Sequence, residues 1–265
     1  MEKIAVIIPF FNDNINLIKS IKSIKEDCIS FSLDLVLIND GGKQNIDPKL
    51  LCFYNYGEIY YLSYKKNKGV SFARNYGLEF ALKNNYKYIA FLDAGDFCKQ
   101  NRFLIQYNYL NKNEDIKLLG TQVEFVDEDN KILYKTNLPT DYKKIKRHFY
   151  LNIQIYQPSA MMRTDIIEKI GLYPTHYKIS TDYGYFFKIV NQFKVSNIDK
   201  VLVSCIAYKK GISSTKRKEQ VRTRIKVSLK YFYFGFYPIY GLLRNILLLL
   251  VSRNFSDKVK RLIYK

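Results

Sequence analysis

The stretch Tyr88-Ile89-Ala90-Phe91-Leu92-Asp93-Ala94-Gly95-Asp96 joins an unbroken apolar run to two carboxylates. An apolar run without polar alternation is typical of a strand that is buried on both faces of a parallel sheet. Ligands of open α/β sheets collect beyond the carboxyl ends of such strands. Asp93 and Asp96 therefore lie where a hard divalent cation and a substrate phosphate are expected. Acidic residues at strand ends are also common in plain turns, so the stretch alone leaves both interpretations open.

The chain before residue 98 alternates short apolar runs with amphipathic segments. The amphipathic segments are recognised by apolar residues at helical spacing, such as Ile15, Ile18 and Ile21. Strands are expected at residues 4–8, 34–39, 59–63 and 88–92, and helices around 15–24 and 70–83. This alternation predicts an α/β fold with a mostly parallel sheet, right-handed crossovers and flanking helices, and hence a Rossmann-like nucleotide-binding half over residues 1–98.

The periodicity loosens after residue 100. Strands are expected near 117–126, 155–162 and 198–207, and a helix over 183–192. The pattern is mixed rather than alternating, so residues 99–208 are interpreted as the half that binds the second substrate. Together the two halves form one expected catalytic domain, residues 1–208, with a helical extension over 209–265.

The extension is first basic and then apolar. Residues 209–230 hold nine Lys and Arg against one acid, Glu219, and residues 231–251 are aromatic and leucine-rich. A basic segment followed by an apolar aromatic one is typical of an interfacial anchor on an anionic membrane surface. Pro238, Gly241 and Arg244 disfavour the alternative of a transmembrane hairpin. A third alternative is a pair of amphipathic helices that pack on the catalytic domain.

The net charge of +19 indicates an anionic partner. Nucleic acid is disfavoured, because the basic residues lie beside an apolar stretch and no recognition module is present. A dehydrogenase is disfavoured because no G-x-G-x-x-G follows the first strand. Four scattered cysteines without a C-x-x-C pair argue against structural zinc and a disulfide framework. The N-terminus runs directly into a strand without a signal peptide, so a cytoplasmic location on the inner face of the cytoplasmic membrane is expected.

Five segments, taken in order, resemble family 2 glycosyltransferases of the GT-A fold. They are Val6-Ile7-Ile8-Pro9-Phe10-Phe11-Asn12, Leu37-Ile38-Asn39-Asp40-Gly41-Gly42, residues 67–77 with the pattern G-x-x-x-A-R-N-x-G, residues 91–96, and Ser180-Thr181-Asp182-Tyr183. The resemblance implies inverting, metal-dependent transfer of a hexosyl or N-acetylhexosaminyl group from a nucleotide-sugar donor, expected to be UDP-linked. The implied acceptor is a hydroxyl of a growing bacterial surface glycan, such as lipooligosaccharide, capsule or a lipid-linked glycolipid intermediate.

The resemblance also assigns the donor site. Asp40 is expected to accept a hydrogen bond from the base, and its alternative is an ordinary Asp-Gly-Gly turn. Arg74 is expected to pair with the diphosphate, and its alternative is a solvated helix charge. The wall of the donor site next to Asp40 is expected to comprise Pro9, Phe11 and Asn12.

Asp96 resembles the principal ligand of a Mn²⁺ or Mg²⁺ cofactor, with Asp93 contacting the ribose or the waters of the metal. Asp182 resembles the catalytic base, and its alternative is a helix N-cap. Thr181 replaces a frequent Glu of the family, so only Asp182 is carried over from that motif. Two other departures keep a non-catalytic GT-A-like binding or scaffold subunit as the alternative function. Gly95 replaces the middle acid, and residues 208–214 lack a histidine, although Lys209, Lys210 or Ser213 could cover the phosphates.

Overall fold

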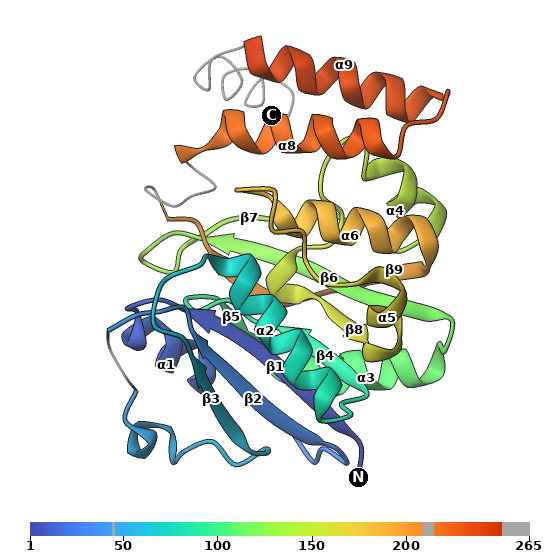
Figure 1. Ribbon diagram of the computed structural model, residues 1–265. Coiled ribbons are helices and arrows are strands. Elements are labelled where there is room, and N and C mark those ends of the chain that lie inside the picture. Colours follow the sequence, from blue (N-terminus) through green and yellow to red (C-terminus); the bar gives the residue numbers. More distant parts are fainter. Residues whose placement is uncertain (44–45, 209–214, 251–265) are drawn as a thin grey trace.

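The computed structural model describes residues 1–43, 46–208 and 215–250 and contains a nine-stranded mixed sheet (Figure 1). Its strand order is β3-β2-β1-β4-β8-β6-β9-β5, and β7 pairs with β6. The first four strands are parallel: β1 (Lys3–Phe10), β2 (Ser32–Asn39), β3 (Ile59–Ser63) and β4 (Tyr88–Phe91). The others are β5 (Phe97–Cys98), β6 (Ile116–Val126), β7 (Ile132–Lys135), β8 (Met161–Arg163) and β9 (Lys194–Ile206).

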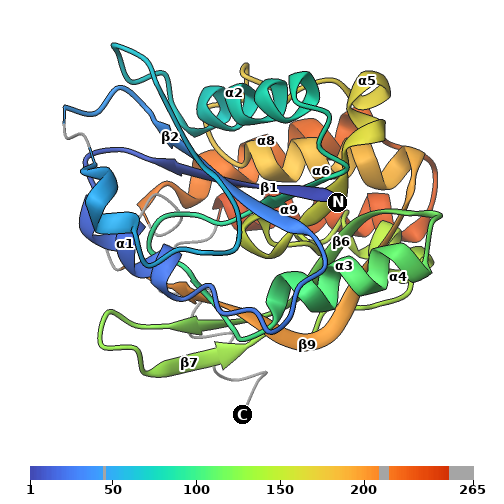
Figure 2. The ribbon, with the colours of Figure 1, turned by 90° about the horizontal axis from the view of Figure 1, so that it is seen from below.

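Helices cover both faces of the sheet (Figure 2). Because successive side chains of a strand point to opposite faces, Ile4 and Val6 of β1 join one core cluster whereas Ala5 and Ile7 join the other. The first cluster is completed by α1 (Asn14–Lys22) and α3 (Arg102–Lys112), and the second by α2 (Val70–Lys83) and α6 (Thr181–Gln192). The unbroken apolar runs thus reflect burial on both sides.

Short elements connect these layers. They are η1 (Pro48–Leu51), α4 (Tyr142–His148), η2 (Gln157–Ser159), η3 (Thr164–Ile166) and α5 (Ile167–Ile170). The strand expected at 155–162 is wrong over most of its length. Residues 157–159 form a 3-10 turn that contains Pro158, which has no N–H for a strand ladder, and β8 starts only at Met161.

The C-terminal extension forms a helical hairpin of α8 (Arg217–Lys230) and α9 (Phe236–Leu250), which lies over α6 in Figure 1. The ring of Tyr231 stacks on Phe187 of α6, and the hydroxyl of Tyr150 donates a hydrogen bond to the carbonyl of Tyr231. A Cβ on Gly241 would lie 2.4 Å from the carbonyl oxygen of Tyr150, so a glycine is needed where α9 crosses that loop. The hairpin therefore packs on the domain, as the third alternative predicted.

One side of α9 is nevertheless exposed and apolar. This apolar stripe consists of Phe236, Ile239, Tyr240, Leu243, Ile246, Leu247 and Leu250. The spacing of three and four residues places these side chains along one face of the helix. Pro238 lies in the first turn of α9, where a proline is tolerated, so it does not interrupt the helix. Within the described ranges, no helix combines the length and the apolar character needed to cross a bilayer.

Candidate active site

The carboxyl ends of the parallel strands meet at one edge of the sheet. The register pairs Phe10 with Asn39 and Asn39 with Ser63, and β4 runs beside β1 in the same direction. The segments that follow β1, β2 and β4 therefore emerge together, which brings Asn12, Asp40 and Asp93 to the same edge. This edge is where an open α/β sheet binds ligands.

The loop after β4 is a tight turn that requires glycine at position 95. The Asp96 amide donates to the Asp93 carbonyl at 3.0 Å, and the Gly95 amide donates to the Ser20 hydroxyl at 2.8 Å. Gly95 has φ +101°, and a Cβ there would lie 2.8 Å from the Tyr208 hydroxyl oxygen. Glycine therefore suits position 95, because its φ is positive and the Tyr208 hydroxyl lies close to where a Cβ would be.

Asp96 lies where the charged form of its carboxyl group is disfavoured. Its Oδ1 accepts a hydrogen bond from the Ile206 amide at 3.1 Å. Burial and the nearby charge of Asp93 raise the pKa of Asp96 to about 8. The buried Arg102 lies behind the loop and donates to the Phe91 carbonyl at 2.8 Å. Sequence reasoning missed Arg102, because nothing in the spacing of an amphipathic helix marks a buried guanidinium.

The donor set suits a hard cation shared with phosphate oxygens. Two carboxylates, Asp93 and Asp96, belong to one four-residue loop, and the raised pKa of Asp96 shows that its charged form is disfavoured here unless a cation stabilises it. Among residues 1–43, 46–208 and 215–250, no group of three or more His, Cys, Asp or Glu could hold a metal by itself. Mg²⁺ and Mn²⁺ are commonly bound by one or two carboxylates together with substrate phosphates, so these residues fit such an ion.

Arg74 pairs with Asp93 rather than projecting into solvent. Its Nη2 lies 2.8 Å and 2.9 Å from the two carboxylate oxygens of Asp93, and the guanidinium is almost fully buried. Burial alone would lower the pKa of Arg74, but the charge of Asp93 and, less strongly, that of Asp182 raise it. The alternative of a solvated helix charge is wrong. Contact of Arg74 with a diphosphate stays a prediction.

Each special residue of the G-x-x-x-A-R-N-x-G segment has a physical role. Gly69 begins α2 with φ +96°, and a Cβ on Gly77 would lie 2.8 Å from the Ile7 side chain, so the helix packs closely on β1. The Asn75 side chain accepts from the Tyr173 amide at 2.7 Å and donates to the Tyr173 carbonyl at 3.1 Å. Asn75 thus joins the first half of the chain to the second.

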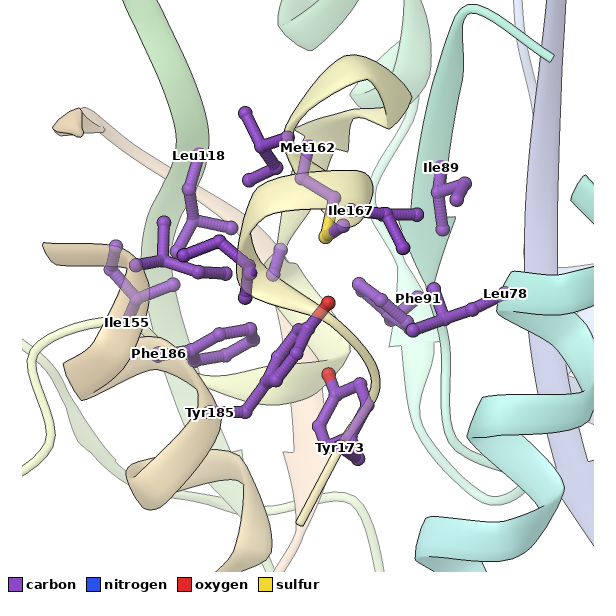
Figure 3. Close-up of a cluster of buried hydrophobic side chains, with 14 of the residues drawn as sticks. Leu78, Ile89, Phe91, Leu118, Ile155, Met162, Ile167, Tyr173, Tyr185 and Phe186 are labelled. Atoms are coloured by element: carbon purple, nitrogen blue, oxygen red, sulfur yellow. The ribbon is translucent and has the colours of Figure 1, made fainter. Parts of the chain in front are cut away.

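Tyr173 connects this junction to the core. Its ring stacks on Tyr185 of α6 with centroids 3.9 Å apart, and Figure 3 shows both beside Phe91. The Arg74 guanidinium carbon lies 5.9 Å from the centroid of the Tyr173 ring. The position of Arg74 is therefore set by α2, by Asp93 and by an aromatic cluster from the second half.

Asp40 is buried and engaged by backbone groups. Its carboxylate accepts hydrogen bonds from the Lys68 amide at 2.9 Å and the Gly69 amide at 2.9 Å. These bonds connect the end of β2 to the start of α2, which a simple Asp-Gly-Gly turn would not require. Contact with a base stays a prediction, and it would use the acceptor capacity that remains on this carboxylate.

The three residues expected to form the adjoining wall differ in setting. Pro9 lies inside β1, opposite Ile38, and is buried. Phe11 is 48% exposed just after the strand. Asn12 has φ +50°, and its Oδ1 accepts from the Lys43 amide at 2.9 Å. Phe11 and Asn12 thus border the edge, whereas Pro9 supports it from within the sheet.

Asp182 lies in the first turn of α6. The N-cap position is taken by Ser180 with φ +57°, so the alternative that Asp182 caps the helix is wrong. Asp182 is near enough to Arg74 of α2 and to Arg224 of α8 to influence the pKa of both guanidinium groups. Asp182 is thus a partly exposed carboxylate at the start of a helix, close to Arg74, which pairs with Asp93. This position is suitable for a general base.

A cavity of about 440 Å³ opens beside Asp96, next to the Ile206 backbone that binds it. It is lined by Asn16, Lys19, Phe97, Glu128, Asn130, Ile206 and Tyr208. Sequence reasoning missed the contribution of α1, because Asn16 and Lys19 look like ordinary polar positions of an amphipathic helix. Lys210, expected to contact the donor, lies outside the described residues, as do Lys209 and Ser213.

A family model described as glycosyl transferase family 2 matches residues 5–171. This chain belongs to that family. The matched span includes Asp40, Arg74 and the Asp93 to Asp96 loop, whereas Asp182 lies beyond it. The family 2 glycosyltransferase assignment confirms the resemblance on which the sequence interpretation rests.

Curated relatives support the same family. An uncharacterized glycosyltransferase of Methanocaldococcus jannaschii is 33% identical over 148 residues, which cover 55% of this chain and 49% of the relative. The Staphylococcus aureus poly(ribitol-phosphate) beta-N-acetylglucosaminyltransferase TarP is 25% identical over 221 residues, covering 74% and 65%. The minor teichoic acid biosynthesis protein GgaA of Bacillus subtilis is 28% identical over 181 residues, covering 62% and 39%. This family 2 chain thus matches between 39% and 65% of the length of these relatives.

Solved structures show that the family 2 fold here is of the GT-A type. Residues 1–349 of S. aureus TarS superpose with a TM-score of 0.67 at 16% identity, covering 98% of this chain and 75% of that one. The same protein in complex with UDP-GlcNAc gives a TM-score of 0.64 at 16% identity, covering 93% and 72%. At this identity the likeness establishes the fold, an α/β GT-A domain followed by C-terminal helices.

Proposed function

We propose that this family 2 glycosyltransferase is an inverting, metal-dependent enzyme that transfers a sugar from a UDP-linked donor to an acceptor hydroxyl. The observation that carries the proposal is the Arg74–Asp93 pair, in which Asp93 influences the pKa of Asp96 and Arg74 is influenced by the candidate base Asp182. The transferred group is expected to be a hexosyl or N-acetylhexosaminyl group. The name of TarP and the UDP-GlcNAc complex of TarS support such a donor by similarity.

The proposed chemistry uses these residues as follows. Asp182 takes the proton of the acceptor hydroxyl while that oxygen attacks the anomeric carbon. The bond from the anomeric carbon to the diphosphate oxygen breaks, and its electron pair leaves with the diphosphate. Mn²⁺ or Mg²⁺ bound by Asp96 and Asp93 would neutralise charge on the leaving diphosphate. Arg74 orients Asp93, and Asp40 fixes the loop that begins α2, so the donor-binding edge is rigid before a ligand arrives.

The proposed acceptor is a growing bacterial surface glycan, such as lipooligosaccharide, capsule or a lipid-linked intermediate. The apolar stripe of α9 supports a peripheral position on the inner face of an anionic cytoplasmic membrane, where such acceptors are assembled. The basic residues of α8 add attraction to anionic headgroups. The names of GgaA and TarP, which concern teichoic acid and poly(ribitol phosphate), support a surface-polymer acceptor.

Calorimetry tests the donor half of this proposal, and a transfer assay tests the catalytic half. We expect UDP to bind more tightly with Mn²⁺ than without it, and we expect Asp96→Ala to remove the difference. Equal affinity of parent and Asp96→Ala for UDP in Mn²⁺ would contradict the assignment of Asp96. Metal-dependent binding without turnover of any UDP-sugar would favour the non-catalytic binding or scaffold subunit, which Gly95 and the missing histidine first suggested.

A further inference from the structure

Arg224 is a guanidinium on the inner face of α8 that the proposed chemistry does not use. Its guanidinium carbon lies 6.0 Å from the centroid of the Tyr183 ring of α6. The Nε atom is buried and has no hydrogen-bond partner among the residues that the structure describes. Elsewhere on α8, Lys226 and Arg222 are exposed, so Arg224 differs from the basic residues that merely face solvent.

The charges around Arg224 come from three elements. Asp182 at the start of α6 is the carboxylate that interacts with it, and Arg244 of α9 is a second cation nearby. Arg244 donates through Nη1 to the Leu151 carbonyl at 2.8 Å. The other titratable groups that influence the pKa of Arg224 are the hydroxyls of Tyr156 and Tyr183. In the part of the chain that the structure describes, no ion pair within 4.0 Å includes Arg224, Arg244 or Asp182.

This cluster holds two cations against one carboxylate in a partly buried place. Burial lowers the pKa of Arg224, Arg244 lowers it further, and Tyr183 and Asp182 oppose the change. A guanidinium without a bound counter-anion is costly where water is scarce, and its planar fork of donors matches phosphate oxygens. An anion that binds to Arg224 would satisfy this buried group.

We infer that Arg224 forms an anion subsite that binds a phosphate group of the acceptor beside Asp182. The inference rests on the proposed function and specifies its acceptor as one that carries phosphate next to the reacting hydroxyl. The position of Asp182 favours the acceptor, rather than the donor, as the source of this phosphate. The carboxylate of Asp182 interacts both with Arg74, at the edge expected to bind the donor, and with Arg224 of α8.

Phosphate could also come from the diphosphate of the donor, so the test measures both ligands. The probes are UDP with Mn²⁺, a glycerol-phosphate oligomer, and an uncharged oligoglycerol of equal length. The variants are Arg224→Gln and, as a matched control, Lys226→Gln, which removes the same charge from an exposed position of the same helix. Calorimetry of each variant, with circular dichroism to verify folding, gives the affinities.

We expect Arg224→Gln to weaken binding of the glycerol-phosphate oligomer by about ten- to a hundredfold, the loss expected for hydrogen bonds to a charged group. UDP affinity and the weak binding of oligoglycerol should not change, and Lys226→Gln should bind the oligomer like the parent. If Arg224→Gln does not fold, Arg224→Lys replaces it. That variant keeps the charge but loses the forked donors, and it should still weaken oligomer binding severalfold.

Several results would overturn the subsite. They are unchanged oligomer affinity in the Arg224 variant, an equal loss in Lys226→Gln, or a loss of UDP affinity that matches the loss for the oligomer. A parent protein that binds UDP but not the oligomer rejects the subsite and leaves the proposed function standing. A parent protein that binds no UDP in Mn²⁺ rejects the proposed function itself.

Discussion

One guanidinium nitrogen of Arg74 contacts both carboxylate oxygens of Asp93, at 2.8 Å and 2.9 Å. The arginine is buried and the aspartate is about one-third exposed. The pair therefore serves the fold as well as the site, because removal of Asp93 leaves a buried charge without its partner. Replacement of Asp93 is therefore expected to affect stability in a way that replacement of Asp96 does not.

Asp93→Ala should lower the free energy of unfolding by about 1–3 kcal/mol, because it leaves the guanidinium of Arg74 unsatisfied. Asp96→Ala should not lower stability at neutral pH, because it removes a carboxyl group whose charged form the metal-free fold disfavours, but it should abolish the stimulation of UDP binding by Mn²⁺. Urea unfolding and calorimetry on both variants measure the two effects. An Asp93→Ala protein as stable as the parent would show that water replaces the aspartate at no cost.

The raised pKa of Asp96, about 8, predicts a pH dependence of stability. The folded state holds this proton more tightly than the unfolded chain, whose carboxyl has the ordinary value of 3.8. Stability should therefore fall as pH rises from about 4 to about 8, because the unfolded state binds fewer protons over that window. Thermal unfolding of the metal-free protein measures the slope. Asp96→Asn should flatten it, and an unchanged slope in that variant would assign the proton to another group.

Gly95→Ala should destabilise the fold by about 1–3 kcal/mol, because it combines an unfavourable backbone conformation with a contact on the Tyr208 hydroxyl. Gly171→Ala is the matched control, since Gly171 has φ +74° and open space around its Cβ position. Tyr208→Phe should recover part of the loss in Gly95→Ala. No recovery in the double variant would mean that the backbone alone requires glycine.

Asp182→Asn should retain fold and UDP affinity but lose about two to four powers of ten in transfer rate, as removal of a general base typically does. The expected change in stability is below about 1 kcal/mol, because Ser180 rather than Asp182 occupies the N-cap and, among the described residues, no ion pair within 4.0 Å includes Asp182. A transfer assay and circular dichroism measure the two quantities. Near-parental transfer would place the base elsewhere.

The apolar stripe of α9 predicts contact with lipid. Deletion of residues 231–265 would be a poor test, because it also removes the stacking of Tyr231 on Phe187. Leu243→Ser with Leu247→Ser is better, since these side chains are 58% and 59% exposed. We expect this variant to bind anionic liposomes less than the parent in flotation assays, with unchanged thermal stability. Leu133→Ser, at a 52% exposed site on β7, is the control and should bind like the parent.

Local patterns predicted the parallel half of the fold closely. The bounds of β3 and α2 agree with the residues expected from apolar runs and helical spacing. The pattern failed at 155–162, because residues buried on all sides look alike in a strand and in a 3-10 turn. Helix α6 begins two residues earlier than expected, since Thr181 and Asp182 belong to its first turn.

Contacts between residues that are distant in sequence were harder to predict than helices and strands. The sequence placed Arg74 and Asp93 at the same edge, but nothing in their spacing predicted that they bind each other. Arg102 and Arg224 were also indistinguishable from surface charges, because periodicity describes a helix and not the cavity that its neighbours leave. A charged side chain that is buried by helices or strands distant in sequence can be recognised only when the three-dimensional positions of those elements are known.

The pairing of β4 with β8 has a consequence for synthesis on the ribosome. Strand β4 belongs to the first half of the chain, but the partner on its second edge is β8, which emerges about 70 residues later. Until then the nascent sheet presents an open apolar edge, which is prone to pair with another chain. Arg163 then closes this edge, because it donates to the Tyr88 hydroxyl at 3.2 Å and to the Leu110 carbonyl at 2.6 Å. The sheet of the first half is therefore complete only once residues 161–163 have been synthesised.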